Sequence, residues 1–253
     1  MKTPIKHTKS ETKALAQILK KIPEGSIIDS FLFFSGQFEF SLADYNRFVC
    51  AHTTKYVIHE FWHCMFEDSE SIYNIINSDS FKFDQRVFET LQENWAKYEE
   101  QYIRSALFFL LNRCSETGDI SSGAMNVENF NKSALADLKT FKPAKNFHLS
   151  YDKCDLIESM RFKSHGDYII INAGNFTYNL FDDGKTVALE ETVINHMDLK
   201  EFLHHTKKKF ILVYKHHNKI PQHYEGFNIE FINKFGKPVE NSDSCKEIII
   251  ANF

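Results

Sequence analysis

One short run of apolar residues constrains the fold of this chain more than any other feature. Residues 167–172 read DYIIIN, a continuous apolar run that is typical of a strand buried on both faces. Such strands occur in parallel sheets that helices cover on both sides. Strand-like runs alternate with helical patterns along the rest of the chain. This alternation predicts an α/β protein.

The other elements follow from apolar spacing and turn signals. We expect helices at residues 10–22, 61–76 and 198–207, a short helix near Ile220, and a long helix at 84–113 that is broken at most once. Residues 114–132 are expected to form an exposed polar loop. Further strands are expected at residues 26–34, 55–58, 147–149, 209–214, 227–232 and 246–251. The last two predict an antiparallel hairpin at the sheet edge, because a Gly-Lys-Pro loop separates them.

Composition narrows the class of protein. A chain of 253 residues is long enough for one core with a small subdomain. With 43% hydrophobic residues and 25 phenylalanines, it is expected to be ordered and globular. It has only 9 glycines and 5 prolines, where average usage gives about 18 and about 13. Loops that bring backbone close to a ligand are therefore scarce.

Charge and cysteine usage bear on partners and compartment. The formal net charge of -4 gives no general attraction for nucleic acid. The five cysteines are widely spaced and never form a CxxC, which favours reduced thiols. The polar start MKTPIKHTKSETK differs from a signal peptide, and no apolar stretch is long enough to span a membrane. We expect a cytoplasmic protein that does not contact membranes, or a protein of a virus particle. The second expectation comes from the abundance of Asn, Lys, Ile and Phe, which fits the AT-rich genome of a phage, virus or other mobile element.

Several strings resemble the Dam-type DNA adenine methyltransferases, which transfer a methyl group from S-adenosylmethionine to adenine. Residues 197–229 read MDLKEFLHHTKKKFILVYKHHNKIPQHYEGFNI and look like the family's helix, KFILSY-type strand, short helix and FNI strand. The ending EIIIANF is similar to ELLITNY, and ALFFLLNR at residues 106–113 resembles the family's FLNR helix end. The resemblance covers nearly the whole chain, and the order and spacing of these strings support it more than any single string does.

The resemblance implies a fold and its domains. It implies a Rossmann-like methyltransferase sheet with helices on both faces and an antiparallel C-terminal hairpin. Residues 1–66 and 145–253 would form this α/β core. Residues 67–144 would form a helical insert at the position of the target-recognition domain.

The same resemblance assigns ancestral cofactor positions. Lys13 matches the lysine of the family's GGK segment, whose two glycines are absent here. The FxGxG loop after the first strand corresponds to Phe34, Gly36 and Phe38, with Phe38 at the last glycine. Because that glycine lets backbone pass close to the cofactor, we expect the Phe38 ring to fill the methionine or ribose space.

Two carboxylates complete the implied cofactor site. Glu60 matches the family's ribose-binding carboxylate after the second strand. Asp152 matches the aspartate that accepts the cofactor's adenine amino group. With the altered loops, we expect no bound cofactor; an active enzyme would bind S-adenosylmethionine.

The catalytic motif departs furthest from the family. Where the family has DPPY to grip the flipped adenine, this chain has Asn172, Ala173, Gly174, Asn175 and Phe176. The Asn172 amide oxygen is a hydrogen-bond acceptor, and Phe176 would stack on a base if the loop shifted by one residue. Both prolines that orient the carbonyl groups towards the amine are missing. We therefore expect no methyl transfer.

The implied recognition loop is also poor in cations. It carries Glu116, Asp119 and Glu128 against Lys132 alone. Phosphate contacts need Lys or Arg, so any DNA binding is predicted to be weak. Lys200 and the lysines at 207–209 fit a solvated helix end better than a phosphate site.

A zinc-protease signature offers a competing interpretation. Residues His59, Glu60 and His63 fit HExxH, in which two histidines bind zinc and the glutamate is the general base. The motif follows the strand expected at residues 55–58, and no third ligand stands at a recognisable spacing. The preferred interpretation of the site therefore has no metal.

These observations together predict a degenerate methyltransferase that serves as a non-catalytic binding or structural assembly subunit. Its partner would be another protein or further copies of the same kind of chain. An active adenine methyltransferase with Asn172 and Phe176 in the catalytic roles is the first alternative. A zinc hydrolase is the second.

Overall fold

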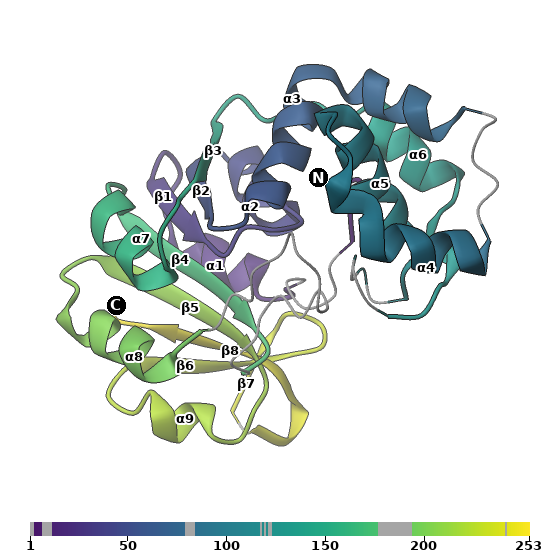
Figure 1. Ribbon diagram of the computed structural model, residues 1–253. Coiled ribbons are helices and arrows are strands. Elements are labelled where there is room, and N and C mark those ends of the chain that lie inside the picture. Colours follow the sequence, from purple (N-terminus) through teal and green to yellow (C-terminus); the bar gives the residue numbers. More distant parts are fainter. Residues whose placement is uncertain are drawn as a thin grey trace.

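A single eight-stranded sheet forms the centre of the protein (Figure 1). The structure is a computed structural model that describes residues 3–6, 12–78, 84–116, 118, 120, 123–176, 194–240 and 242–253. The strand order is β3-β2-β1-β4-β5-β8-β6-β7. The strands are β1 (Ile27–Phe31), β2 (Phe48–Thr53), β3 (Phe147–Tyr151), β4 (Tyr168–Gly174), β5 (Lys209–Lys215), β6 (Asn228–Asn233), β7 (Pro238–Val239) and β8 (Cys245–Ala251).

Strand directions confirm the predicted fold class. Strands β1 to β5 pair in parallel, whereas β8 is antiparallel to both β5 and β6. The result is a Rossmann-like α/β sheet with an antiparallel C-terminal region. The expected hairpin is present, but β8 lies inside the sheet between β5 and β6, and the short β7 forms the edge.

The central strand β4 shows why the apolar runs were informative. All of its residues are buried, and Ile169, Ile170 and Ile171 have no exposed surface. Because successive side chains point to opposite faces, Ile170 packs with one core cluster while Ile169 and Ile171 pack with the other. Both faces of the strand are therefore covered.

Helices cover each face of the sheet. Helices α1 (Leu15–Lys21) and α2 (Gln37–Asp44) contribute to the core cluster that contains Ile170. The opposite cluster includes residues of α7 (Leu156–Lys163), α8 (His196–His205) and α9 (Ile220–His223). Figure 1 shows these three helices in front of the strands. This layering leaves the carboxyl ends of the parallel strands as the place where loops from both faces meet.

A group of helices lies beside the sheet, between β2 and β3 in the chain (Figure 1). It comprises α3 (Tyr56–Ile76), α4 (Gln85–Asn94), the 3-10 helix η1 (Trp95–Lys97), α5 (Gln101–Cys114), the 3-10 helix η2 (Val127–Asn129) and α6 (Lys132–Lys139). Helix α3 is kinked at Asp68, which has non-helical φ and ψ of -156° and 80°. The predicted insert, residues 67–144, begins one residue before this kink. It contains the rest of α3 and the helices that follow it.

Aromatic packing joins these helices to the sheet. Trp62 of α3 lies 5.3 Å from Phe141 and 5.1 Å from Phe40 of α2, measured between ring centroids. Phe40 in turn lies 4.5 Å from Phe147 of β3. The Trp62 indole N–H donates to the Phe34 carbonyl at 2.7 Å. Many of the phenylalanines therefore belong to a core that this group of helices shares with the sheet.

The structure corrects one predicted strand and adds one helix. The strand expected at residues 55–58 is wrong, because these residues begin α3 and the second strand is β2. Apolar residues recur at helical spacing here and bury one face of α3; they are Val57, Ile58, Phe61, Trp62 and Met65. Helix α2 was not predicted, because its residues 38–43 are all buried and give no clear amphipathic period.

The remaining predicted elements are present with shifted ends. The long helix at 84–113 is broken once, at η1. Helix α1 starts at Leu15 rather than at residue 10, and residues 10 and 11 lie outside the described part of the chain.

Candidate functional site

The carboxyl ends of the parallel strands form one edge of the sheet, with β1 and β4 side by side at its centre. The chain goes from β1 to its neighbour β2 on one side and from β4 to its neighbour β5 on the other. The strand order therefore reverses between β1 and β4. In open α/β sheets, ligands bind in the crevice outside such a reversal, so this crevice is the candidate site.

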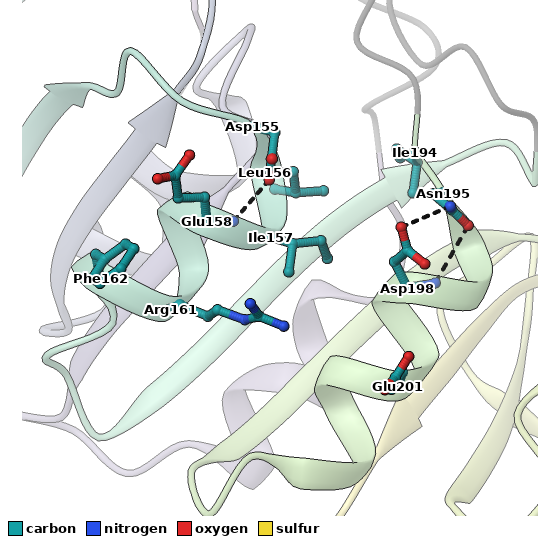
Figure 2. A pocket seen from close by; sticks show the side chains of 10 residues that line it. All are labelled: Asp155, Leu156, Ile157, Glu158, Arg161, Phe162, Ile194, Asn195, Asp198 and Glu201. Atoms are coloured by element: carbon teal, nitrogen blue, oxygen red, sulfur yellow. Dashed lines mark hydrogen bonds between the residues drawn. The ribbon is translucent and has the colours of Figure 1, made fainter.

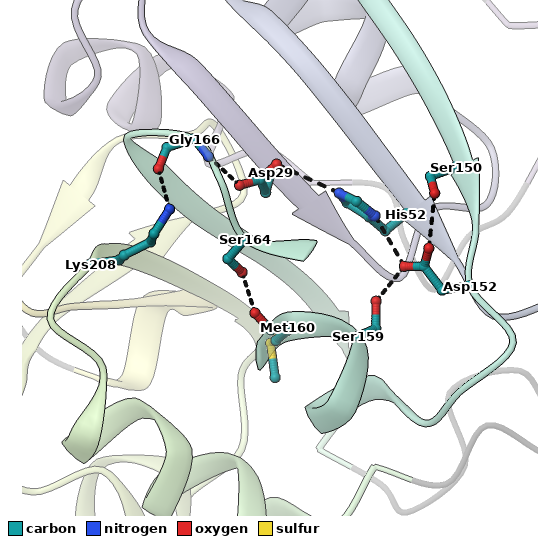
Figure 3. Close-up of polar contacts among 9 residues, drawn as sticks. All are labelled: Asp29, His52, Ser150, Asp152, Ser159, Met160, Ser164, Gly166 and Lys208. Atoms are coloured by element: carbon teal, nitrogen blue, oxygen red, sulfur yellow. Dashed lines mark hydrogen bonds and ion pairs between the residues drawn. The ribbon is translucent and has the colours of Figure 1, made fainter. Parts of the chain in front are cut away.

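His52 and Asp152 meet at this edge (Figure 3). His52 lies near the end of β2 and Asp152 directly after β3. His52 Nδ1 is 3.0 Å from Asp152 Oδ2, and the hydroxyls of Ser150 and Ser159 donate to the same carboxylate. His52 and Asp152 are 6% and 3% exposed. The carboxylate that the resemblance assigns to the cofactor's adenine is therefore surrounded by hydrogen-bond donors of this chain.

Asp29 of β1 lies on the other side of the imidazole (Figure 3). Its Oδ1 is 3.6 Å from His52 Nε2, while its Oδ2 accepts a 2.6 Å hydrogen bond from the Gly166 N–H. The buried Nε2 of His52 makes no hydrogen bond with any residue that the structure describes. Phe31 stacks on the imidazole, with ring centroids 4.6 Å apart. Two carboxylates and an aromatic ring thus hold His52 in place.

The environment of this pair favours its charged forms. Burial by itself lowers the pKa of His52, but the hydrogen bond to Asp152 and the charges of Asp152 and Asp29 outweigh it and raise the pKa above 6.5. Burial also raises the pKa of Asp152, yet hydrogen bonds from His52, Ser159 and Ser150 lower it from 3.8 to about 2. Below the raised pKa of His52, the arrangement is therefore a buried ion pair of imidazolium and carboxylate.

Side chains around His52 leave little space beside it. Among the cavities lined by described residues, the one at His52 has a volume of about 10 Å³ and is lined by Phe31, Leu32, His52, Thr53, Thr54, Leu156 and Ser159. A volume of this size holds about one water molecule. Leu32, the residue after β1, has a left-handed φ of 67° and is 5% exposed. Such a backbone is costly for leucine and persists only where the surrounding packing imposes it.

The loop after β1 serves packing. Gly36 has a φ of 69°, and a Cβ at this position would lie 2.3 Å from Phe40 Cε2. Phe34 is 1% exposed and packs 6.2 Å from Phe108 of α5. The expectation that Phe38 fills the methionine or ribose space is wrong. Because α2 begins at Gln37, the Phe38 ring turns into the core cluster between α1, α2 and the sheet.

Glu60 does not lie at the end of the second strand. It belongs to the second turn of α3 and is 4% exposed. Its carboxylate accepts hydrogen bonds from Arg104 Nε at 2.7 Å and from the Tyr56 hydroxyl at 2.9 Å, and it also pairs with Arg104 Nη2. The residue that stands near the end of β2 is His52. Glu60 instead links α3 to α5.

The HExxH residues lie on α3 rather than after a strand. His59 and His63 stack with ring centroids 5.9 Å apart, and His63 pairs with Glu67 at 3.3 Å. Burial, together with the nearby His63, lowers the pKa of His59. The general base that a zinc protease needs would be Glu60, which Arg104 and Tyr56 hold. Among the described residues, no group of three or more His, Cys, Asp or Glu is arranged to hold a metal ion.

The residues that the resemblance assigns to the catalytic motif lie at the end of β4 and just after it. Asn172 and Ala173 are buried, and the register with β5 shifts between Asn172 and Gly174, where Gly174 has a φ of 63°. The Phe176 ring lies 4.3 Å from that of His196 and 5.2 Å from that of His217. Phe176 thus packs among histidines.

A hydrogen-bonded chain lies beneath Phe176. The His196 Nδ1 is 2.8 Å from the Tyr214 hydroxyl, which lies 3.0 Å from the Tyr224 hydroxyl. Tyr214 and Tyr224 have no exposed surface, and burial raises the pKa of both. These contacts make the region a packed core.

Lys13 lies at a different part of the sheet edge. Its backbone N–H donates to Glu247 Oε2 of β8 at 2.8 Å, and the residue is exposed. Glu247 also pairs with Lys215 at 2.7 Å. Strand β5 separates β8 from β4. The structure therefore brings Asp152 together with His52, but does not bring Lys13 or Glu60 to that pair.

Asn112 and Arg113, the last two residues of the string that resembles FLNR, hydrogen-bond to the N-terminal segment. Asn112 accepts from the Lys6 N–H at 2.7 Å and donates to the Lys6 and Gly118 carbonyls at 2.6 and 2.7 Å. Arg113 Nε donates to the Pro4 carbonyl at 2.5 Å. This part of the insert therefore binds the start of the chain.

Sequence reasoning missed His52, Asp29 and Ser159. Asp29 carries a signal, because a carboxylate within the mostly apolar strand β1 needs a buried partner. His52 carries none, since its partners lie 23 and 100 positions away in the chain.

Comparisons with known proteins do not add a relative. No protein-family model matches the chain, and no curated protein matches it. Within the described ranges, no helix has both the length and the apolar character needed to cross a membrane.

Proposed function

We propose that this protein is a degenerate member of the Dam-type adenine methyltransferases that works as a non-catalytic binding or assembly subunit. The strings quoted above suggest the family, and the sheet has the helices on both faces and the antiparallel C-terminal strands that the resemblance implies. The proposal separates the fold, which is kept, from the chemistry, which is lost.

The contact between His52 and Asp152 carries this proposal. In the resemblance, Asp152 accepts the adenine amino group of S-adenosylmethionine. Here its carboxylate accepts from His52, Ser150 and Ser159, and the cavity that the described residues leave beside His52, about 10 Å³, has no room for a nucleoside. The residues present therefore do not fit the cofactor, and no methyl-transfer step is derived through it.

The surroundings of the catalytic motif support the same conclusion. A flipped adenine needs an aromatic face and polar acceptors in an open pocket. Phe176 instead packs against His196, His217 and His223 with centroid distances of 4.3, 5.2 and 5.6 Å. The recognition loop has Glu116 and Glu128 among its described residues, which oppose phosphate, and Asp119 lies outside the described part of the chain. A protein partner fits these features better than duplex DNA.

A calorimetric titration with S-adenosylmethionine tests the proposal. We expect no binding heat at millimolar ligand and no methyl transfer to adenine-containing DNA, with an active Dam-type enzyme as the positive control. Micromolar binding followed by methylation would overturn the proposal and establish the active-enzyme alternative.

A variant of His52 sharpens this experiment. His52→Ala removes the ring that occupies Asp152, while Ser150 and Ser159 stay in place. A gain of measurable adenosine binding is expected, since the carboxylate and the space beside Phe31 become accessible. His148→Ala is the matched control, because His148 is an exposed histidine on the neighbouring strand β3. It should bind no more ligand than the natural protein.

A further inference from the structure

A groove runs between helices α7 and α8 on the sheet face opposite α1 and α2 (Figure 2). Its volume is about 710 Å³, and a second cavity of about 300 Å³ adjoins it through the shared residues Arg161 and Glu201. Figure 2 shows Ile157 and Arg161 reaching from α7 towards α8. The groove shares Leu156 with the cavity beside His52, but neither His52 nor Asp152 lines the groove.

Negative charge dominates the groove walls. Four carboxylates line it and face one guanidinium, that of Arg161; they belong to Asp155, Glu158, Asp198 and Glu201. Asp155 caps α7, and Asp198 accepts from Asn195 at 2.7 Å. The side chains of Glu158 and Glu201 make no hydrogen bond or ion pair with any described residue, and both residues are exposed. Two carboxylates are therefore available to a cationic partner.

Apolar side chains also line the groove. Leu156, Ile157 and Ile194 line the groove, and Phe162 at the end of α7 is 67% exposed. An exposed phenylalanine beside an apolar surface with a charged rim is the usual composition of a protein-binding patch. The surface therefore suits a partner that presents apolar and basic side chains together.

We propose that this groove docks a basic amphipathic helix of a partner protein. A helix laid across α7 and α8 would place its apolar stripe on Ile157 and Phe162 and its Lys or Arg residues beside Glu158 and Glu201. The same carboxylates repel nucleic acid and anionic lipid surfaces. The inference rests on the proposed function as a binding subunit, since it names the surface that binding would use.

Fluorescence anisotropy with a labelled model helix tests the groove in the full-length protein. The probe is a lysine–leucine peptide whose leucines recur every three or four residues, and the same peptide with glutamate in place of lysine is its control. We expect saturable binding of the basic peptide, weakened at least tenfold by the double variant Glu158→Lys/Glu201→Lys. Phe162→Ser should weaken binding several-fold, because it removes apolar contact area from an exposed position.

A charge-matched control separates docking from general attraction. Glu89→Lys/Glu93→Lys changes two exposed carboxylates of α4 by the same amount, and it should bind the basic peptide as the natural protein does. Equal weakening by both double variants, or no binding of the basic peptide, would overturn the proposal. Self-association that only Glu158→Lys/Glu201→Lys abolishes would also overturn it, by assigning the groove to a second copy of the chain.

The two proposals fail in distinguishable ways. S-adenosylmethionine titrations on the same samples report on the crevice, and peptide anisotropy reports on the groove. Cofactor binding with intact peptide binding would remove the proposed function alone. Lost peptide specificity without cofactor binding would remove the groove alone.

Discussion

At the residue scale, the ion pair of His52 and Asp152 makes stability depend on pH in a defined window. The raised pKa of His52 contributes stability below about pH 6.5, which is lost as the pH rises through its folded-state value. Because the pKa of Asp152 is lowered to about 2, its ionised carboxylate contributes about 2 kcal/mol to the free energy of unfolding above about pH 4. This contribution is lost as the pH falls towards 2. The pair therefore stabilises the fold most between about pH 4 and about pH 6.5.

Urea denaturation of the natural protein and of Asp152→Asn measures this contribution. The variant leaves His52 with a weaker partner, and we expect it to lose about 3 kcal/mol of unfolding free energy at pH 5.5. The loss should be smaller at pH 8.5, where the imidazole is closer to neutral. A loss independent of pH would contradict the ion-pair assignment.

Glu39 provides a second prediction at this scale. It lies in the first turn of α2, is 4% exposed, and accepts from the Ser30 hydroxyl at 3.0 Å. Burial raises its pKa from 4.5 to about 7, so the carboxylate form destabilises the fold as the pH rises through that range. Glu39→Gln keeps the shape and a hydrogen-bonding partner for Ser30 but carries no charge. It should raise the unfolding free energy by about 3 kcal/mol at pH 8 and change it little at pH 4.5, as followed by urea denaturation.

At the element scale, the turn from β1 into α2 depends on Gly36. Alanine there would combine a left-handed φ of 69° with a Cβ placed 2.3 Å from the buried Phe40 ring. Phe40 is packed against Trp62 and Phe147 and has little room to move. We expect Gly36→Ala to cost at least about 3 kcal/mol, as measured by chemical denaturation.

Gly25 is the matched control for Gly36. Its φ is 77°, but a Cβ added at this position would have no atom within 4 Å. Gly25→Ala should therefore show only the backbone cost of about 1 kcal/mol. Equal losses for the two variants would show that backbone strain, and not the contact with Phe40, makes Gly36 necessary.

At the scale of the whole molecule, the N-terminal segment connects two parts of the protein. Residues 3–6 lie on the insert through Asn112 and Arg113, whereas α1 packs on the sheet. Asn112→Ala removes three hydrogen bonds and leaves the backbone of Lys6 and Gly118 without those partners. It should cost about 2 kcal/mol and speed hydrogen exchange at the Lys6 amide.

Asn94→Ala is the corresponding control. Asn94 contacts the Thr90 carbonyl and the Lys97 ammonium near the surface of the insert. Its loss should change the unfolding free energy by less than about 0.5 kcal/mol and leave exchange at Lys6 unaltered. Faster exchange at Lys6 in this variant would show general loosening of the insert.

The sequence by itself determined the buried part of the sheet. The runs at 167–172 and 209–214 became β4 and β5, because an apolar run that cannot face water on either side must be covered on both. The break in the long helix and the short helix at Ile220 were also predicted, since local spacing and turn residues encode them.

Only the tertiary structure decided the candidate site. The residues at 55–58 have side chains suited to a strand, yet α3 forms there because Phe61 and Trp62 extend its buried face. His52 and Asp152 form a pair, with Asp29 beside it, only when β1, β2 and β3 align at one edge of the sheet. Contacts between positions so far apart leave no periodic pattern in the chain. The shortage of glycine predicted altered cofactor loops, but the packing of the fold placed His52, and not Phe38, against the carboxylate of Asp152.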